Sequence, residues 1–302
     1  MADLSTELCG MKLRNPVLLA SGVWGETGAT LARAARSGAG GVVTKSVGPD
    51  ARNGYNNPTI VEVDTGIINA VGLSNPGIAD FGKEVDEAKA GGVPVIGSII
   101  GGDARTIADV AVRMASYGVA AVELNLGCPH AKGLGSELGH DPSVVKEVVA
   151  TVKRAVKVPV LAKITPNVSD IRVIAKAVQE GGGDAVVAIN TVRAMAISAP
   201  MAKPILHNAL GGYSGRGIKP IGLACVWQVH KAVTIPIVGV GGIMTGEDVA
   251  EYLMAGATCV QIGTALQGRG EDAFKLICRE LSKFMDENGH KNVHDLVGMA
   301  HR

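Results

Sequence analysis

Eight short apolar runs, separated by longer amphipathic segments, are the feature that most restricts the fold of this 302-residue chain. Val, Ile, Leu, Ala and Gly fill the runs at consecutive positions rather than at alternate ones. This pattern is typical of strands buried on both faces, as parallel strands covered by helices are. The runs span residues 16–22, 40–46, 93–99, 120–127, 158–164, 184–190, 235–241 and 258–265.

The segments between and after these runs have the helical period of apolar residues. They predict helices over 27–37, 78–90, 104–117, 142–156, 169–181, 219–233, 246–255 and 271–287. Asp103, Asp141 and Ser169 stand near three of the starts as expected N-caps. Glycines 91–92 and 181–183 follow two of the ends, where a left-handed cap favours glycine. Eight strand–helix units predict an α/β fold, a single (β/α)8 TIM-barrel domain over residues 1–302.

Two long insertions interrupt this alternation, at residues 47–77 after the second strand and 191–218 after the sixth. Both follow the carboxyl end of a strand, which lies on the catalytic face of a TIM barrel. Long loops at such positions usually carry function, so we expect both to border the active site. The first residues, LSTELCGMKLRNP, predict a small hairpin under the barrel.

Charge and composition exclude several classes of protein. Lys and Arg number 29 against 28 Asp and Glu, and aromatic residues make up only 3%, which argues against a nucleic-acid partner. No apolar run approaches the roughly 20 residues that cross a bilayer, and the N-terminus lacks a signal peptide's apolar region. The five cysteines form no C-x-x-C pair, so we expect free thiols in the cytoplasm. The histidines have no metal-ligand spacing, and no metal is expected.

Polar residues at the ends of the predicted strands identify the candidate site. Lys45, Asn125, Lys163 and Asn190 end four of the strands, and all should point into one mouth. Cys128 directly follows the fourth strand, before Pro129 and a glycine-rich stretch at 131–140 that resembles a lid. We expect Cys128 to be exposed there, with His130 within reach. Cys9, Cys225, Cys259 and Cys278 are expected to be inert thiols.

Glycines at the ends of the last two strands predict a phosphate site. Gly241-Gly242 and Gly263-Thr264 can offer bare backbone N–H groups, and a helix begins shortly after the first pair. The chain has neither a P-loop nor the G-x-G-x-x-G fingerprint of dinucleotide-binding proteins. The phosphate is therefore expected to belong to a flavin mononucleotide or to a phosphosugar.

Nine segments, taken together and in order, resemble the dihydroorotate dehydrogenases, specifically the class 1B catalytic subunit, over nearly the whole chain. They are NPVLLASG (15–22), TKSV (44–47), NAVGLSNPG (69–77), VELNLGCPH (122–130), LAKITPN (161–167), INT (189–191), GGYSGRGIKPIGL (211–223), IVGVGGI (237–243) and VQIGTA (260–265). The resemblance implies oxidation of dihydroorotate to orotate, with hydride transfer to FMN, in de novo pyrimidine (UMP) biosynthesis.

The same resemblance implies a role for each matching residue. Cys128 matches the general base, and since a free thiol has a pKa near 8.5, turnover should rise toward alkaline pH. Lys163 would stabilise the negative charge that builds up on the reduced flavin. The residues matching the substrate pocket are Lys45, Asn69, Ala70, Val71, Gly72, Leu73, Asn125, Asn190 and Thr191. Those matching the FMN contacts are Ser21, Lys45, Ser46, Asn125, Lys163, Ile189, Gly215, Gly241, Gly242, Gly263 and Thr264.

Partners also follow from the resemblance. Class 1B enzymes pass electrons to a second subunit that carries FAD and an iron–sulfur cluster, and then to NAD. The chain itself has no cysteine spacing for such a cluster, so that subunit would be a separate protein. The expected assembly is a homodimeric core within a heterotetramer.

Three departures from the family pattern keep alternatives open. Gly127 and His130 replace the Ser and Asn of the commoner NLSCPN, and Ser98 stands where many relatives have Asn. The CPH tripeptide also occurs in dihydropyrimidine dehydrogenases, which makes uracil or thymine an alternative substrate. A phosphate-binding barrel without redox chemistry is a further alternative, because a fold alone does not fix a function.

Overall fold

Eight parallel strands close into a barrel in the computed structural model, which describes residues 2–127 and 138–302. The order of the strands around the barrel is β10-β15-β16-β3-β4-β7-β8-β9, so chain neighbours lie side by side all the way round. Each strand lies within one of the predicted runs, which confirms the TIM-barrel prediction. The strands are β3 (Val17–Leu19), β4 (Val42–Val43), β7 (Val95–Ile99), β8 (Ala121–Asn125), β9 (Val160–Ile164), β10 (Ala185–Ala188), β15 (Ile237–Val240) and β16 (Cys259–Ile262).

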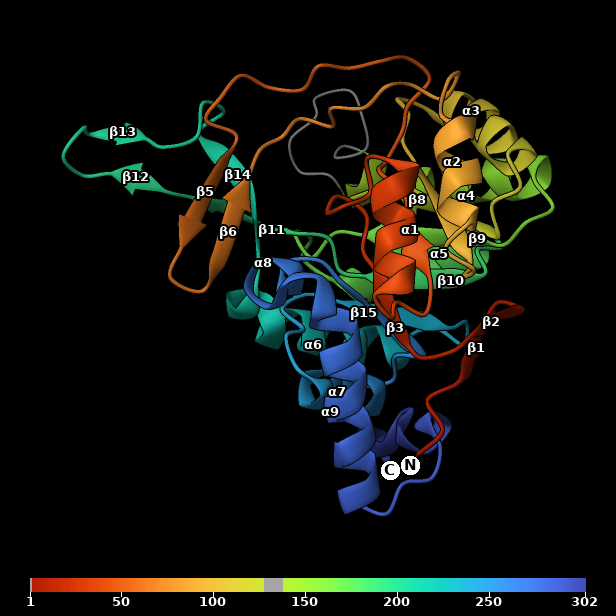
Figure 1. The fold of residues 1–302 in the computed structure, drawn as a ribbon. Helices are drawn as coiled ribbons and strands as arrows, with labels where there is room; N and C mark the ends of the chain where they lie inside the picture. Colours follow the sequence, from red (N-terminus) through yellow and green to blue (C-terminus); the bar gives the residue numbers. More distant parts are fainter. Residues whose placement is uncertain (1, 128–137) are drawn as a thin grey trace.

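Helices cover the outside of the barrel at the eight predicted places (Figure 1). They are α1 (Gly28–Arg36), α2 (Gly82–Lys89), α3 (Ala104–Ser116), α4 (Pro142–Ala155), α5 (Ile171–Glu180), α6 (Lys219–His230), α7 (Gly246–Met254) and α9 (Ala273–Glu287). The short helix α8 (Ala265–Arg269) follows β16 directly and was not predicted. Among the helices formed by residues 2–127 and 138–302, none has both the length and the apolar character required to cross a membrane.

Aspartate side chains cap the starts of α3, α4 and α5. Asp103 and Asp141 accept hydrogen bonds from backbone N–H groups of α3 and α4, as predicted. The prediction of Ser169 for α5 is wrong, because the cap is Asp170. The Asp170 carboxylate accepts from the Arg172 amide and also pairs with its guanidinium, which a serine hydroxyl could not do.

The predicted N-terminal hairpin consists of β1 (Thr6–Leu8) and β2 (Met11–Leu13), which pair in antiparallel fashion. Leu8, Met11 and Leu13 pack against the inward side chains at the amino end of the barrel, such as Leu18 and Ile96. Full burial of a leucine contributes roughly 1.5–3 kcal/mol to the free energy of unfolding. The hairpin therefore stabilises the protein as well as closing the bottom of the barrel. The open end of the barrel is therefore the carboxyl end of the strands.

The two long insertions pair with each other instead of forming separate loops. Strands β5 (Ile60–Val63) and β6 (Gly66–Asn69) come from the first, and β11 (Val192–Met195) and β14 (Leu210–Ser214) from the second. They form one antiparallel sheet in the order β11-β14-β6-β5, with Asn69 opposite Gly212. A short hairpin, β12 (Ile197–Ser198) and β13 (Lys203–Pro204), extends beyond it on one side of the barrel (Figure 1). The insertions were predicted, but their strands were not.

Candidate active site

A cavity of about 630 Å³ lies at the carboxyl ends of the barrel strands, and residues of the insertion sheet line part of it. Its volume is within the roughly 300–1,000 Å³ typical of small-molecule sites. Many of the predicted site residues line it: Ser21, Lys45, Ser46, Asn69, Val71, Gly72, Leu73, Asn125, Lys163, Ile189, Asn190, Thr191, Gly215, Gly241, Gly242, Gly263 and Thr264. Of the predicted residues in the described ranges, Ala70 alone is outside the lining, buried against Ile68 and Leu206. Cys128 and His130 lie outside the described residues.

A chain of hydrogen bonds crosses the mouth of the barrel and orients its amide side chains. Asn190 donates through Nδ2 to Oδ1 of Asn125 at 3.0 Å, and Asn125 donates through its own Nδ2 to Oγ of Ser46 at 3.0 Å. The Ser46 hydroxyl also lies 3.3 Å from that of Ser21 and 2.8 Å from that of buried Ser98. Each asparagine keeps one amide hydrogen for a ligand, so both present a donor to the cavity.

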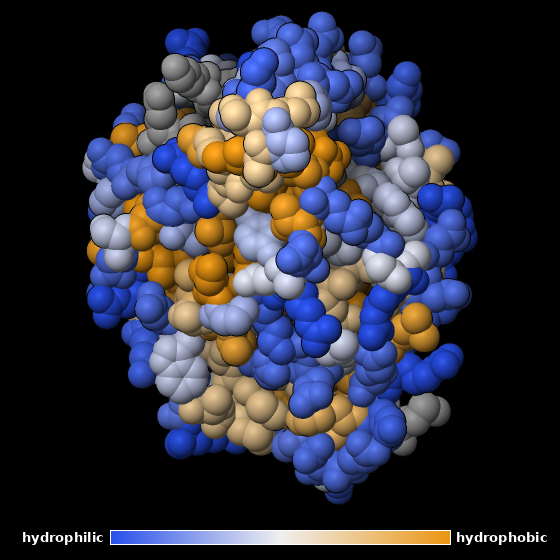
Figure 2. Space-filling model, turned by 90° about the vertical axis from the view of Figure 1, so that its left-hand side faces the viewer, coloured by the Kyte–Doolittle hydropathy of each residue, from blue (hydrophilic) through white to orange (hydrophobic). Residues whose placement is uncertain are grey.

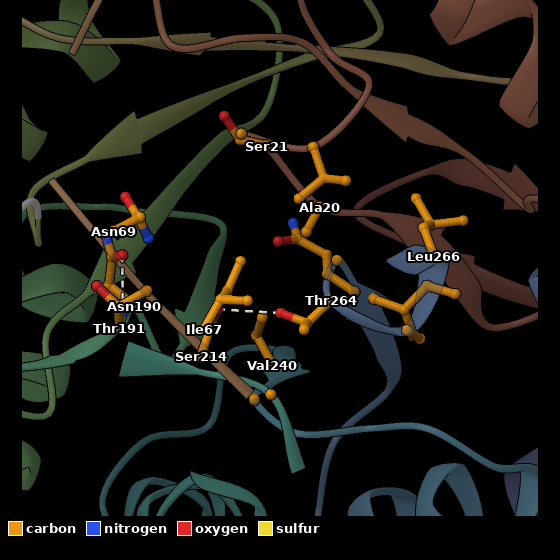
Figure 3. Close-up of a pocket in the computed structure, with 18 of the residues that line it drawn as sticks. Ala20, Ser21, Ile67, Asn69, Asn190, Thr191, Ser214, Val240, Thr264 and Leu266 are labelled. Atoms are coloured by element: carbon orange, nitrogen blue, oxygen red, sulfur yellow. Dashed lines mark hydrogen bonds between the residues drawn. The ribbon is translucent and has the colours of Figure 1, made fainter. Parts of the chain in front are cut away.

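The cavity has two chemically different ends (Figure 3). Asn69, Asn190 and Thr191 gather on one side of the view, and these side chains offer amide and hydroxyl groups. Val240, Thr264 and Leu266 lie on the other, where Thr264 donates a hydrogen bond of 3.0 Å to Ser214 of β14. That bond ties the insertion sheet to the rim of the barrel.

Both predicted lysines are buried at the site. Lys45 is 8% exposed and Lys163 is 6% exposed. Lys45 Nζ lies 3.2 Å from a carboxylate oxygen of Glu26, whose side chain is 71% exposed. The site therefore holds one cation at its edge, next to a solvent-accessible carboxylate, and one in its floor.

Two polar residues that sequence reasoning missed are Gln261, in the floor of the cavity, and Glu123, beneath it. Lys163 Nζ donates to Oε1 of Gln261 at 2.9 Å, and Gln261 Nε2 donates to Oε2 of Glu123 at 2.6 Å. Burial lowers the pKa of Lys163, and the negative charge of Glu123 opposes that shift. Glu123 and Gln261 stand inside runs that read as apolar, so only their inward position in the barrel, with Glu123 two residues before Asn125, could have indicated them.

The predicted phosphate end of the cavity is rich in glycine, with Gly241, Gly242 and Gly263 in its lining. At Gly242, with φ of +70°, an added Cβ would lie 2.6 Å from the amide nitrogen of Lys219. At Gly263 an added Cβ would make only ordinary contacts, with Val23 at 3.4 Å and Ala20 at 3.7 Å, so packing does not require a glycine there. Gly242 is therefore required by the fold, whereas the lack of a side chain at Gly263 leaves room for a ligand to approach the backbone.

The helix start after Gly242 is not available to an anion, contrary to expectation. The amides of Met244 and Thr245 both donate to Oδ2 of Asp248, at 2.8 and 2.9 Å. The amide of Gly246 donates to the Glu280 carboxylate at 2.9 Å. These carboxylates already satisfy the N-terminus of α7, so any phosphate would have to be bound by the glycine backbone before it.

The loop after β6 is held firmly over the cavity. The Arg52 side chain donates to the carbonyl oxygen of Gly72 at 2.7 Å, and the Tyr55 amide donates to that of Val71 at 3.0 Å. Leu73 has a φ of +57°, which a residue with a side chain adopts at a cost of about 1–3 kcal/mol. Backbone strain of this kind is common at ligand-binding sites. Leu73 lines the cavity, which is consistent with such a site.

The described cysteines match their prediction as unreactive thiols. Burial raises the pKa of Cys225 and Cys9 to about 11 and that of Cys278 to about 12, and it also raises the pKa of Cys259. Gly127, the residue before Cys128, has no room for a side chain, since an added Cβ would lie 2.9 Å from Cβ of Asn190. The glycine at this departure from the common motif therefore fits the local packing.

Comparison with known proteins gives one consistent result. The family model described as dihydroorotate dehydrogenase matches residues 3–285. A protein of Methanocaldococcus jannaschii is 50% identical over 302 residues, covering 99% of this chain and 98% of its own, and one of Thermoplasma acidophilum is 50% identical over the full length of both. A protein of Pyrococcus abyssi is 48% identical over 297 residues, covering 98% of this chain and 99% of its own. All three are named "Dihydroorotate dehydrogenase B (NAD(+)), catalytic subunit".

Proposed function

The chain belongs to the dihydroorotate dehydrogenase family, and from this premise we propose that it oxidises dihydroorotate to orotate in pyrimidine biosynthesis. One observation carries the proposal: the residues that match the family's motifs, from distant parts of the sequence, line a single cavity. The relatives reported above are named for dihydroorotate, which favours this substrate over uracil or thymine. It also favours redox chemistry over a barrel that only binds phosphate.

FMN fits the cavity on the strength of two observations. Gly263 lines the cavity without a side chain although packing does not require a glycine there, so a phosphate could approach its backbone. The Lys163 ammonium in the floor donates to Gln261 and keeps further donor hydrogens for an anionic or electron-rich ligand. We assign the phosphate to the backbone of Gly215, Gly241, Gly242, Gly263 and Thr264. We assign the ring to Ser21, Lys45, Ser46, Asn125, Lys163 and Ile189. When bound, FMN supplies the acceptor for the hydride that leaves the substrate.

The substrate is assigned to the amide-rich end of the cavity. Orotate is a planar ring with N–H and C=O groups along its edge, and asparagine offers both a donor and an acceptor to such an edge. Asn69, Asn125 and Asn190, with Thr191, would pair with the ring. Lys45 would attract its carboxylate, and residues 70–73 would cover it from the insertion side.

Proton removal is assigned to Cys128. Its thiolate would take a proton from carbon 5 of dihydroorotate while the hydride departs from carbon 6, which leaves the new double bond of orotate. Cys128 follows Gly127, which lies beside Asn190 of the cavity, since a Cβ added at Gly127 would be 2.9 Å from the Asn190 Cβ. With an ordinary thiol pKa near 8.5, proton removal would accelerate as the pH rises toward that value.

The name of the relatives as catalytic subunits favours a partner subunit, and we propose that it carries FAD and an iron–sulfur cluster and passes electrons to NAD.

We also propose a homodimeric core, in the cytoplasm. Apolar side chains lie exposed on the insertion sheet and its hairpin: Met195, Ile197, Met201 and Leu210. Figure 2 shows the molecule from the side on which this sheet and hairpin lie, and apolar atoms gather in the upper part of that view. Such a patch is a typical protein interface. Light scattering on the wild type and on Ile197→Glu tests the dimer.

The decisive experiment is a visible spectrum of the purified protein, before and after anaerobic addition of dihydroorotate. Flavin absorption that bleaches with dihydroorotate, and persists when dihydrouracil is added instead, supports the cofactor, the substrate and the reaction together. Bleaching by dihydrouracil alone would transfer the assignment to the dihydropyrimidine dehydrogenases. A protein that takes up no FMN would contradict the proposal.

A further inference from the structure

Three polar side chains from three different strands form a line inside the barrel, under the cavity. Glu123 on β8 is 0% exposed, Gln261 on β16 is 1% exposed and Lys163 on β9 is 6% exposed. The hydrogen bonds run from Lys163 Nζ to Gln261 Oε1 and from Gln261 Nε2 to Glu123 Oε2. Lys163 and Gln261 line the cavity, but Glu123 does not. Glu123 therefore reaches the cavity only through the amide of Gln261.

The order of donors and acceptors along this line is set from the Glu123 end. An ionised carboxylate can only accept, so it draws the NH2 end of the Gln261 amide toward itself. The carbonyl end must then face the Lys163 ammonium, which can only donate. Without the carboxylate, the amide could turn by half a rotation and direct its NH2 group at the ammonium. The Lys163 side chain would then have to leave its position or lose its proton.

A stabilising role alone does not explain this line. In the described part of the chain, Oε1 of Glu123 is fully buried and has no hydrogen-bond partner. A buried carboxylate with one bare oxygen destabilises a fold, and buried ion pairs can often be replaced by apolar residues without loss. The line does, however, fix one buried cation in the floor of the site.

We propose that Glu123, acting through Gln261, is a positioning residue that holds the Lys163 ammonium in the floor of the cavity, where it stabilises the reduced, negatively charged cofactor. This inference rests on the proposed function, because it needs a flavin in the cavity. It adds two residues, Glu123 and Gln261, to the proposed function. They set the affinity for the cofactor and its reduction potential, and they take no part in proton removal from the substrate.

The test measures the FMN midpoint potential and the FMN dissociation constant at one pH in four variants: Glu123→Gln, Lys163→Gln, the double variant E123Q/K163Q and the exchange E123Q/Q261E. Glu123→Gln should lower the potential and weaken FMN binding by about tenfold, since a hydrogen bond to a charged group has that effect or more. Lys163→Gln should act in the same direction. In E123Q/K163Q the two effects should not add.

The exchange E123Q/Q261E is the rescue. It keeps one carboxylate and one amide, with the carboxylate now directly against Lys163 and the amide of residue 123 donating to it. The potential and the affinity should return toward those of the wild type. Thr6→Val is the matched control, because Thr6 Oγ1 is also a buried atom without a partner among the described residues but lies in the hairpin under the barrel. It should change neither quantity.

Three results would overturn the inference. A rise in potential in Glu123→Gln would mean that Glu123 acts only as a nearby negative charge while Lys163 stays in place. Unchanged potential and affinity, or additive effects in E123Q/K163Q, would mean that Glu123 and Lys163 act independently. If wild-type protein binds FMN and is bleached by dihydroorotate, these results leave the proposed function intact. If the wild type binds no FMN, the proposed function fails first and the inference fails with it.

Discussion

Lys45 and Glu26 form an ion pair at the edge of the cavity, with the lysine buried and the glutamate largely in solvent. A ligand carboxylate assigned to Lys45 must compete with Glu26 for the same ammonium. Glu26→Gln should therefore lower the dissociation constant of orotate, by up to about fivefold, since an exposed ion pair contributes at most about 1 kcal/mol. Titration of flavin absorbance with orotate measures it. An unchanged constant would mean that Lys45 does not contact the carboxylate.

Cys128→Ala should separate binding from chemistry. The variant should bind dihydroorotate but reduce the flavin at least about 10²-fold more slowly, the lower end for loss of a general base. Anaerobic stopped-flow measurement of flavin bleaching gives both the binding and the rate. Cys225→Ala is the control, because burial raises the pKa of that thiol to about 11 and the site does not use it. An unchanged rate in Cys128→Ala would remove the base assignment.

Gly263→Ala and Gly242→Ala form a matched pair that tests the phosphate assignment. In Gly263→Ala the new methyl group meets ordinary contacts only, so the fold should be retained while FMN affinity falls about tenfold or more. In Gly242→Ala the methyl group would collide with the backbone at Lys219, so stability should fall by about 1–3 kcal/mol. Melting temperatures and FMN titrations distinguish the two. Undiminished FMN affinity in Gly263→Ala would remove that residue from the site.

Asp248 should make the stability of the protein depend on pH. Burial raises the pKa of Asp248, but the Lys219 ammonium and the amides of Met244 and Thr245 outweigh this effect, and the pKa lies below its ordinary value. A depressed carboxyl pKa stabilises the fold above the unfolded value of about 3.9, and the gain disappears as the pH falls through the folded value.

The corresponding variant is Asp248→Ala, which should cost about 1–2 kcal/mol at pH 7, as the loss of a helix cap does. Melting temperatures of variant and wild type should converge as the pH falls below about 4. A gap that stays constant down to pH 3 would show that packing, rather than the ionised carboxylate, is responsible.

The barrel could be predicted because each of its strands carries its own signal. A strand such as Val160–Ile164 is buried on both faces, so almost all of its residues are apolar and the run is visible in the sequence. The polar residues at the strand ends were predictable for the same reason, because the fold brings all carboxyl ends together. Most of the predicted site residues accordingly line one cavity.

What could not be predicted depends on partners far away in the chain. Asn69 pairs with Gly212 across the two insertions, and no local pattern in either segment specifies that register. Glu123 and Gln261 are neighbours only because the barrel closes, and each looks like an isolated polar residue in an apolar run. The Ser169 error was local, since two adjacent residues could both cap a helix and only the pairing with Arg172 favours Asp170.

The shared sheet of the two insertions has a consequence for anyone who would redesign the enzyme. Loops on a barrel are often treated as interchangeable parts, each to be grafted from a relative by itself. Here residues 66–69 and 210–214 form two hydrogen-bonded strands of one sheet, and this sheet contributes both Asn69 and Ser214 to the cavity. Replacing one insertion alone would leave the strands of the other with an unpaired edge. To change the substrate preference, both insertions therefore have to be exchanged together.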